Sequence, residues 1–455
     1  MNIILLSGGS GQRLWPLSNE IQSKQFMKIF KKADAVTQGT SPLQNIDSAQ
    51  DDAYESMLQR VYRQIKQIDA GAKVTIATAK SQVSAIHNQL GDDVGISVEP
   101  YRRDTFPAIA LACAYLHDVQ GVQDDETVVV VPVDPYVEED YFEALKELDA
   151  LAKKNEAALS LMGMEPTYPS EKYGYIIPAD KGKISAVKEF KEKPDEETAK
   201  RYIENGALWN GGIFAFRMDY IMNKAHTLID FEDYQDLFHR YETVEKISFD
   251  YAVAEKEERI NVLRFSGTWK DIGTWNTLVE TMDEPVFGKA ILNDNCQGVN
   301  VVNALDVPVL CMGLKDVIVS ASPEGVLVSD KHESSYIKPY VDAIDQQVMF
   351  AEKSWGSFKV LDVSEEGLTI KVTLNAGNRM NYHSHERRDE VWTVVEGEGM
   401  TIVDGMTQRV KPGDVVTMEA GCRHAVVADT KLTLIEVQLG RDISVKDKIK
   451  YEWPV

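Results

Sequence analysis

The 455-residue chain predicts an α/β domain with a Rossmann-like, mostly parallel sheet, followed by a short β-solenoid-like segment and a small C-terminal β-barrel. Strand-like and helix-like patterns alternate over about the first 280 residues, as they do in βαβ units. After about residue 285 short strand-like runs follow one another without a helical period. A chain of this length exceeds one hydrophobic core. We therefore predict three domains, at 1–285, 286–346 and 347–455.

The elements of the first domain follow from apolar periodicity. Apolar side chains at helical spacing from Tyr54 to Ile65 predict an amphipathic helix, and Thr105–Asp118 and Tyr141–Asn155 predict two more. The predicted strands are Asn2–Leu6, Lys73–Ala77, Gly95–Glu99, Thr127–Val131 and Ala157–Gly163. In such sheets ligands bind beyond the carboxyl ends of the strands. Gly8 and Asp134 both occupy that kind of position.

The remaining chain reads as β-structure. Four runs separated by turn residues fit a turn or two of a left-handed β-helix-like linker: Val299–Asn303, Val307–Met312, Val317–Ala321 and Val326–Ser329. Ile337–Gln346 is the expected linking helix. From Ser357 to Val437 strand patterns with glycine-containing turns predict the barrel.

Composition excludes several classes of function. The formal charge of −23 argues against nucleic acid or an anionic membrane as a partner. No run approaches the roughly 18 apolar residues of a membrane span. The segment MNIILLSGGSG reads as a first strand and not as a signal peptide. Four cysteines without metal-type spacing fit a reducing cytoplasm, where we expect the protein to act.

A glycine-rich loop follows the first strand directly. In the segment from Leu6 to Leu14, LSGGSGQRL, glycines allow close approach of a ligand, and successive N–H groups can cradle phosphate oxygens. The spacing matches neither a dinucleotide fingerprint nor a P-loop. An ordinary strand-to-helix turn is the alternative. Arg13 inside the loop and Lys24 after it favour phosphate binding, because an acidic chain needs local cations, amides or Mg²⁺ to attract phosphates.

At this point the chain resembles a family. The segment LSGGSGQRLWPL with Lys24-Gln25-Phe26 is similar to the signature of bacterial mannose-1-phosphate guanylyltransferases. Further matches occur in the same order over about the first 280 residues: Glu99-Pro100, Arg103-Asp104-Thr105, Asp134, Tyr173-Gly174-Tyr175, Phe190–Pro194, Trp209–Phe214, Asp250-Tyr251-Ala252 and Trp269–Trp275. The chain departs from the family pattern at Ser23, where proline is usual, and at Asp104, where asparagine is usual.

The resemblance implies a reaction and its partners. Mannose 1-phosphate would attack the α-phosphorus of GTP, releasing pyrophosphate and GDP-mannose for polysaccharide biosynthesis. By resemblance, Arg13 and Lys24 hold the triphosphate, and Asp134 and Asp271 bind Mg²⁺. The implied nucleotide-binding residues are Leu6, Gly8, Gly9, Gly11, Arg13, Lys24, Arg103 and Asp104, and the implied sugar-phosphate-binding residues are Gly174, Glu192, Lys193 and Asn210. The alternative readings are a turn or cap for each aspartate and a solvated surface lysine for Lys193.

A second group of residues lies in the predicted barrel. On a strand His383 and His385 point to the same face, so both imidazoles can reach one metal ion. With Glu390 and His424 they form a ligand set suited to Zn, Fe, Mn, Ni or Co. The spacing of Gly377, His383, His385, Glu390 and Gly397 resembles the first cupin motif, and Gly413, Gly421 and His424 match the second in part.

The barrel leaves three functions open. In the guanylyltransferase family a C-terminal cupin often confers mannose-6-phosphate isomerase activity. Here Val391 stands between Glu390 and Trp392, where the family has histidine, and the arginine-rich ending is absent from Arg441–Trp453. The alternatives are a non-catalytic binding or regulatory module and a structural part that serves stability or homo-oligomerisation.

Overall fold

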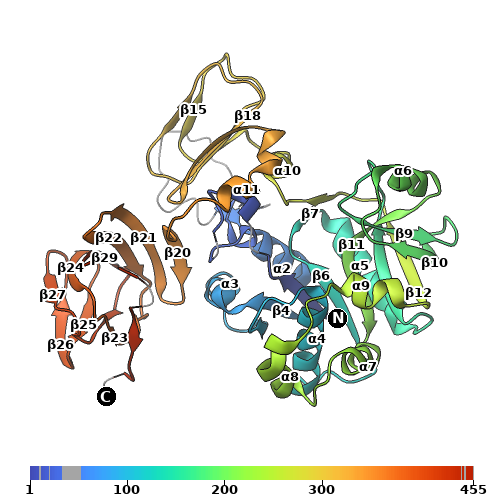
Figure 1. The fold of residues 1–455 in the computed structure, drawn as a ribbon, viewed down its shortest axis with the longest axis horizontal. Helices are drawn as coiled ribbons and strands as arrows, with labels where there is room; N and C mark the ends of the chain where they lie inside the picture. The colour runs from blue at the N-terminus through green and yellow to red at the C-terminus, as the bar shows by residue number, and fades with distance from the viewer. Residues whose placement is uncertain (10–11, 20, 33–52, 442, 445–446, 454–455) are drawn as a thin grey trace. The chain divides into compact units, whose positions relative to one another are not determined.

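The computed structural model describes residues 1–9, 12–19, 21–32, 53–441, 443–444 and 447–453 (Figure 1). The chain divides into two compact units. The first comprises Met1–Leu14 and Ser23–Pro285, and the second comprises Trp15–Gln22 and Val286–Val455. Among the described residues, no helix combines the length and apolar character that crossing a membrane requires.

A nine-stranded sheet forms the centre of the first unit. In spatial order its strands are β5 (Gly95–Glu99), β4 (Lys73–Ala79), β1 (Asn2–Ser7), β6 (Thr127–Pro132), β11 (Leu208–Arg217), β8 (Leu159–Met164), β12 (Ile260–Phe265), β10 (Ile184–Lys191) and β9 (Gly174–Pro178). The strands β5, β4, β1 and β6 are parallel, and their carboxyl ends meet at one edge. That edge carries the glycine loop after β1 and Asp134 after β6.

The second half of the sheet corrects the prediction of a mostly parallel arrangement. Strand β11 runs antiparallel to both β6 and β8, and β10 runs antiparallel to β9 and β12. Only β8 and β12 continue the parallel pattern there. The short connection between β9 and β10 is a hairpin, and hairpins require antiparallel neighbours. The sheet is therefore mixed, within the α/β class that the sequence predicts.

The predicted helices of the first unit are present. Helix α2 (Met57–Ile68) begins after Ser56, whose side chain accepts from Gln59 N in a capping box. Tyr54 lies before this helix in the short strand β3 (Tyr54–Glu55). Helix α5 (Glu139–Lys153) covers the predicted third helix. Helix α4 (Thr105–Ala114) continues into a π-helical turn at Tyr115–Val119.

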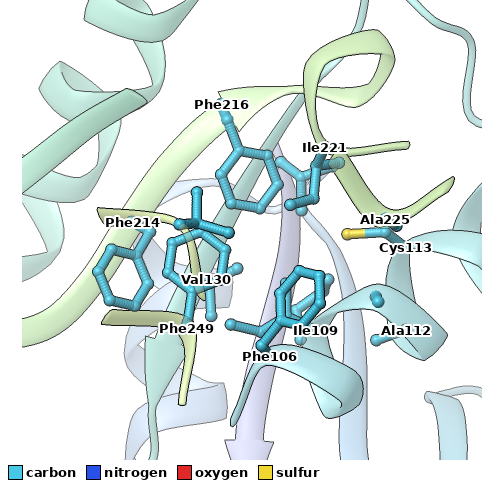
Figure 2. Close-up of a cluster of buried hydrophobic side chains, with 14 of the residues drawn as sticks. Phe106, Ile109, Ala112, Cys113, Val130, Phe214, Phe216, Ile221, Ala225 and Phe249 are labelled. Atoms are coloured by element: carbon cyan, nitrogen blue, oxygen red, sulfur yellow. The ribbon is translucent and has the colours of Figure 1, made fainter. Parts of the chain in front are cut away.

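The main core surrounds α4, in which every residue from Phe106 to Ala114 is buried. Phe214 of β11 packs against Phe249 of helix α9 (Phe249–Ala252) with ring centroids 4.4 Å apart. Helix α7 (Met218–Leu228) contributes Ile221 and Ala225 to the same cluster (Figure 2). Because burial on all sides excludes water, α4 is a rigid element, and its first turn presents Asp104 and Thr105 to the sheet edge.

The second unit begins with parallel β-structure. Strands β14 (Val286–Phe287), β16 (Asn300–Asn303) and β18 (Val317–Ser322) pair in parallel, and β19 (Gly325–Asp330) closes the sheet as an antiparallel hairpin partner of β18. Strands β15 (Ala290–Leu292) and β17 (Val309–Cys311) form a second parallel pair. Parallel pairing of successive short strands is typical of a solenoid. The expected linking helix is shorter than predicted, with α11 covering only Lys338–Val341.

Two antiparallel sheets form the C-terminal barrel. The first has the order β20 (Phe350–Lys353), β21 (Gly356–Val363), β22 (Gly367–Leu374), β29 (Leu432–Leu439), β24 (Asp389–Glu396) and β27 (Val415–Met418). The second has the order β26 (Met406–Val410), β25 (Gly399–Val403), β28 (His424–Ala428), β23 (His383–Ser384) and β30 (Ile449–Lys450). Side chains from both sheets, including Trp392, Met418 and Val426, share one core.

Candidate active site and candidate metal centre

A cavity of about 380 Å³ lies beside the glycine loop, and we call it the loop cavity. Leu6, Gly8 and Gly9 form one wall where β1 ends. Asp104 and Thr105 at the start of α4 and Asp134 after β6 also line the cavity. The open backbone of Gly8 and Gly9 lets a ligand approach the loop closely.

Buried side-chain amides hold the loop cavity's first wall in place. Gln25, 1% exposed, donates from Nε2 to the carbonyl and hydroxyl oxygens of Ser7 at 3.2 and 3.1 Å. Gln82, fully buried, donates to Ser23 Oγ at 2.7 Å and to the Gly9 carbonyl at 3.4 Å. These buried hydrogen bonds restrict the motion of the loop backbone. Ser23, at the position where the family usually has proline, is thus part of this hydrogen-bond network.

Glu99 brings a carboxylate into the loop cavity. Its Oε2 accepts a hydrogen bond from the Tyr241 hydroxyl at 3.0 Å. Burial raises the pKa of Glu99 to about 7, although the Tyr241 hydrogen bond opposes the shift. Asp104 has a left-handed backbone conformation, with φ of 71°, and its carboxylate accepts from Thr105 N at 2.8 Å. The cavity therefore offers acidic acceptors to a ligand rich in N–H donors.

Asp134 and Asp271 lie next to each other. Strand β13 (Trp269–Asp271) pairs antiparallel with β7 (Pro135–Val137), and the register places Asp271 opposite Pro135. Lys24 Nζ lies 2.9 Å from Asp134 Oδ2 and donates to the Ile272 carbonyl at 3.0 Å. Two carboxylates and one ammonium group thus converge at the sheet edge.

The electrostatics of this group favour a divalent cation. Burial raises the pKa of Asp271, and the Asp134 carboxylate raises it further, whereas Lys24 and Arg13 lower it. Arg13 is exposed within the short helix Gln12–Leu14. Mutual repulsion of two partly buried carboxylates is relieved by a hard cation, for which carboxylate oxygens are the preferred ligands. Asp134 and Asp271 therefore fit Mg²⁺.

A second cavity of about 240 Å³ lies beside β11, and we call it the strand cavity. Gly174, Glu192 and Asn210 line it together with Asp134 and Asp271. The buried Glu192 Oε2 has no hydrogen-bond partner in the described structure, so it can accept from a ligand hydroxyl. Glu192 Oε1 accepts from Lys193 Nζ at 2.5 Å.

Asp250 completes the polar wall of the strand cavity. Asn210 Nδ2 donates to Asp250 Oδ1 at 2.6 Å, and Asn210 Oδ1 accepts from Gly212 N at 3.1 Å. Burial and the nearby Glu192 raise the pKa of Asp250 to about 6. Carboxylates and an amide around one small cavity are typical of a site for a polyhydroxylated ligand.

The barrel brings its three predicted histidines together. Their side chains offer ligand atoms within 4.8 Å of one another, and all three residues are buried. Each Nδ1 faces a backbone carbonyl: His383 that of Asn381, His385 that of Asp447 and His424 that of Cys422. An Nδ1 that donates to a carbonyl leaves Nε2 as the metal-binding nitrogen.

The position of Glu390 also supports metal binding through the Nε2 atoms of the histidines. Its carboxylate oxygens lie 3.2 Å from His385 Nε2 and 3.2 Å from His424 Nε2. When Nδ1 carries the proton, each Nε2 has a lone pair, and two acceptors facing each other need a cation between them. Arg388, 7% exposed, supplies one positive charge, donating to Glu390 Oε1 and approaching His385 Nε2 at 3.0 Å. The four residues fit a divalent transition metal.

Comparisons with known proteins identify two families along the chain. A model of the nucleotidyl transferase family matches residues 2–285, more than half of the chain. The chain belongs to the nucleotidyl transferase family. A cupin domain model matches residues 370–437.

Two relatives match nearly the whole length of the chain, and a solved structure matches three quarters of it. A mannose-1-phosphate guanylyltransferase of Salmonella montevideo is 26% identical, covering 98% of each chain. The alginate biosynthesis protein AlgA of Pseudomonas aeruginosa is 27% identical, covering 98% of this chain and 95% of its own. A solved structure named mannose-1-phosphate geranyltransferase, from Thermus thermophilus, covers 75% of this chain and 98% of its own at 26% identity, with a TM-score of 0.60.

The nucleotidyl transferase domain gathers most of the predicted site residues around two adjoining cavities, which share Pro132 and Asp134. Two predicted residues, Arg103 and Lys193, are placed differently from the expectation. Arg103 donates to the Glu242 carbonyl, and Arg102 lines the loop cavity instead. Lys193 is half-exposed and paired with Glu192, and Gly11 lies outside the described residues.

Sequence reasoning assigned no role to several residues of the nucleotidyl transferase cavities. The motifs shared with the guanylyltransferase family include four of them, Glu99, Tyr173, Asp250 and Trp269. The motifs could therefore have drawn attention to these residues, but they do not indicate which motif residues face a cavity. Arg102, Lys172 and Lys246 line the cavities without any distinguishing pattern in the sequence. Their positions depend on how loops from distant segments meet.

Proposed function

We propose that the protein transfers a guanylyl group from GTP to mannose 1-phosphate, forming GDP-mannose and pyrophosphate. The observation that carries the proposal is the meeting of two polar cavities at Asp134, beside Asp271 and Lys24. One cavity is bounded by a glycine loop and suits a nucleotide, and the other is bounded by carboxylates and an amide and suits a sugar. The names of the relatives support the choice of mannose and guanine.

The proposed reaction is a direct displacement. A phosphate oxygen of mannose 1-phosphate forms a bond to the α-phosphorus of GTP, and the bond from that phosphorus to the oxygen bridging to the β-phosphorus breaks. The electron pair leaves with pyrophosphate. Lys24 and Arg13 bind the triphosphate and offset the charge that develops on the leaving group. Asp134 and Asp271 would hold Mg²⁺, which supplies charge neutralisation between two anionic reactants.

Positioning is the remaining contribution of the chain. The N–H groups of the glycine loop, held by Gln25 and Gln82, orient the phosphates before reaction. Glu192, Asp250 and Asn210 hold the sugar hydroxyls. Lys193, with Lys172 at the cavity wall, binds the sugar phosphate once its ion pair with Glu192 opens. Holding both reactants in line lowers the entropic part of the barrier.

Glu99 supports selection of guanine. Guanine presents adjacent N1–H and N2–H₂ donors on its Watson–Crick edge, and an ionised carboxylate accepts from both. Uracil and thymine present one N–H between two carbonyl groups, which a carboxylate repels. We therefore assign Glu99 as the residue that distinguishes GTP from pyrimidine nucleotides.

A pyrophosphate-release panel tests the proposal. It crosses GTP, ATP, UTP and dTTP with mannose 1-phosphate and glucose 1-phosphate in the presence of Mg²⁺. The expected result is release with GTP and mannose 1-phosphate, strongly reduced in Asp271→Asn. A well-folded wild-type protein that releases no pyrophosphate with any pair would reject the assignment.

For the barrel we propose metal binding, with mannose-6-phosphate isomerase activity as the second candidate function. The three histidines and Glu390 favour the metal. Valine in place of the family's histidine at Val391 instead favours a non-catalytic binding or regulatory module. The full chain, loaded with Zn²⁺ or Co²⁺ and incubated with fructose 6-phosphate, decides between them. Formation of mannose 6-phosphate indicates the isomerase, and its absence ends that candidate.

A further inference from the structure

The short segment Trp15–Gln22 belongs to the second unit, although Leu14 and Ser23 on either side of it belong to the first. Arg13 precedes this segment and Lys24 follows it. Each cation that we assign to the triphosphate is therefore separated by a single residue from a segment that belongs to the second unit.

The start of the segment is fixed against the β18–β19 hairpin. Ser322 Oγ donates to the Pro16 carbonyl at 2.5 Å, and Ser322 Oγ also accepts from Glu324 N at 3.0 Å. The indole of Trp15 lies so close to Gly325 that a Cβ there would fall 2.5 Å from Trp15 Cζ2. Any larger residue than glycine at this position would displace Trp15.

Asn19 fixes the end of the segment. Its Oδ1 accepts from Ile21 N at 2.9 Å and Gln22 N at 2.6 Å, closing a tight turn. Its Nδ2 donates to Glu324 Oε1 at 2.8 Å and to the Phe350 carbonyl at 2.9 Å. One side chain thus shapes the turn and ties it to residues more than 300 positions away in the chain.

Glu324 is the centre of this arrangement. It is only 7% exposed, and its Oε1 accepts from Met349 N and Phe350 N, both at 3.0 Å, as well as from Asn19. Gln346 Nε2 donates to the Glu324 backbone carbonyl at 2.8 Å. A buried carboxylate is tolerated only when donors satisfy it, so these contacts specify one arrangement.

We propose that Glu324 is a positioning residue for guanylyl transfer. Through Asn19 it holds the segment that joins Arg13 to Lys24, and through Met349 and Phe350 it links that segment to the first strand of the barrel. Arg13 is exposed and has little packing of its own, so its placement depends on how the adjoining chain is held. Loss of the Glu324 contacts lets Arg13 leave the geometry that charge stabilisation requires, whereas Lys24 keeps its contacts to Asp134 and Ile272. This inference rests on the proposed transferase activity.

Two substitutions break the link in different ways. Glu324→Ala removes the carboxylate that accepts from Asn19, Met349 and Phe350 at Oε1 and from Gln346 at Oε2. Asn19→Asp keeps the turn, because Oδ1 still accepts from Ile21 N and Gln22 N, but it replaces the donor to Glu324 by a second carboxylate oxygen. We expect each to lower kcat/KM for GTP by about tenfold or more, since small misplacements of reacting groups have effects of this order. Glu324→Gln keeps an acceptor for Asn19, Met349 and Phe350, so we expect it to stay within about threefold of wild type.

A double substitution separates positioning from general destabilisation. If Asn19 and Glu324 act through one link, the effects of Asn19→Ala and Glu324→Ala should not add. The kcat/KM of the double variant should then be no lower than that of the more impaired single variant. Asn303→Ala is the matched control. Asn303 is 2% exposed in the same unit and donates to the Lys289 and Val307 carbonyls, without contacting the segment. We expect this control to lower the Tm and leave kcat/KM unchanged.

The outcomes are distinct. Folded Glu324→Ala and Asn19→Asp proteins with wild-type kinetics would overturn the positioning role, as would an equal loss of kcat/KM in Asn303→Ala. If Glu324→Ala does not fold, Asn19→Asp decides alone, because it retains the turn. A wild-type protein without pyrophosphate release overturns the transferase assignment and this inference together, before any variant is compared.

Discussion

At the scale of single residues, charge governs the candidate active site. Lys24 is 13% exposed and lies between the Asp134 carboxylate and the Ile272 carbonyl, so its ammonium group is held where a triphosphate would meet the two aspartates. The chain carries a net charge of −23, so such local cations decide whether a polyanion binds. Glu99 shows the opposite effect, a carboxylate whose ionisation burial makes costly.

Replacement of Lys24 should abolish most activity. We expect Lys24→Ala to lower kcat/KM for pyrophosphate release by about a hundredfold or more, because it removes a preorganised charge at the leaving group. Steady-state pyrophosphate assays measure the effect. Lys200→Ala is the control, since Lys200 forms only an exposed i,i+4 pair with Glu196. A Lys24→Ala protein with wild-type kinetics would remove this residue from the mechanism.

Nucleotide binding should depend on pH through Glu99. Its pKa is raised to about 7, so the ionised form that accepts from guanine prevails above pH 7 and is lost as the pH falls. We expect kcat/KM for GTP to fall by up to about tenfold per pH unit below that value. Glu99→Gln should weaken GTP use and lack this acid limb. The comparison of the two proteins cancels the titration of GTP itself, and identical profiles would contradict the role of Glu99.

Protonation of Glu99 and Asp250 should stabilise the folded protein, although protonation of Glu99 weakens the use of GTP. The pKa values of Glu99 and Asp250 are raised to about 7 and about 6 in the folded state. Their contribution to the free energy of unfolding is fully present below the pKa values that these groups have in the unfolded chain. It is lost as the pH rises through 6 and 7. Asp250→Asn and Glu99→Gln should therefore reduce the loss of Tm between pH 5 and 8, which calorimetry measures. An unchanged Tm profile in both variants would show that burial does not penalise these groups.

At the scale of elements, strand pairing builds each site. Gly174 of β9 lies opposite Asn210 of β11, just before the irregularity in β11 that turns Asn210 toward Asp250. In the barrel, His383 of β23 lies opposite His424 of β28, and His385 follows on the same face. Residues far apart in sequence thus become neighbours through backbone hydrogen bonds.

Gly174→Ala should affect the sugar and spare the nucleotide. A Cβ at this position would collide with the Glu192 carboxylate and crowd Asn210. We expect KM for mannose 1-phosphate to rise by about tenfold, with KM for GTP changed less than about twofold, because only the strand cavity is distorted. Initial-rate measurements with each substrate varied test this. Gly71→Ala is the control, since a Cβ there meets only Asp69 Oδ1 at 3.4 Å.

Metal removal should destabilise the barrel. We expect dialysis against a chelator to lower the Tm of the full chain and added Zn²⁺ or Co²⁺ to restore it, because a ligand that binds only the folded state stabilises it. His424→Ala should abolish this response and the visible absorption of bound Co²⁺. His332→Ala, whose side chain is 81% exposed, is the control. A Tm independent of metal in the wild type would contradict the assigned centre.

At the scale of the whole molecule, each of the two units is formed by two separate stretches of the polypeptide. The excursion Trp15–Gln22 joins them near the N-terminus, and Pro285 to Val286 joins them again. The chain is strongly acidic, whereas the cations that we assign to phosphate are confined to a few positions. The net negative charge should therefore repel the proposed phosphorylated substrates at long range, while the local cations attract them at short range.

Moderate salt should assist the binding of GTP. Ions screen repulsion over distances greater than the Debye length, about 10 Å at 0.1 M, before they weaken contacts inside the cavity. We expect kcat/KM for GTP to rise by about twofold between about 20 and 150 mM KCl and to fall at higher salt. Sucrose at equal osmolality is the control. A steady decline from the lowest salt would show that local cations, and not net charge, dominate association.

Much of the architecture could be predicted from the sequence. The apolar runs that became β1, β4, β5 and β6, and the stripe that became α2, carry strong local periodicity. Glycine spacing indicated the loop, and histidine spacing indicated the candidate metal ligands. The antiparallel course of β11 could not be read in the same way, because a buried strand has the same composition in either direction. The role of Glu324 was equally hidden, since an isolated glutamate in a turn has no distinguishing pattern.

The amino-acid sequence by itself determined the α/β class, the change to β-structure after about residue 285, and the identity of the charged side chains and of the candidate metal ligands. These are local properties of composition and spacing. Only the tertiary structure decided which of those side chains meet: Asp271 beside Asp134, Asp250 beside Asn210, and Asn19 bound to Glu324. The physical reason is that these contacts depend on strand pairing and loop packing between distant segments. The energies of such packing involve many residues at once and produce no periodic pattern in the sequence.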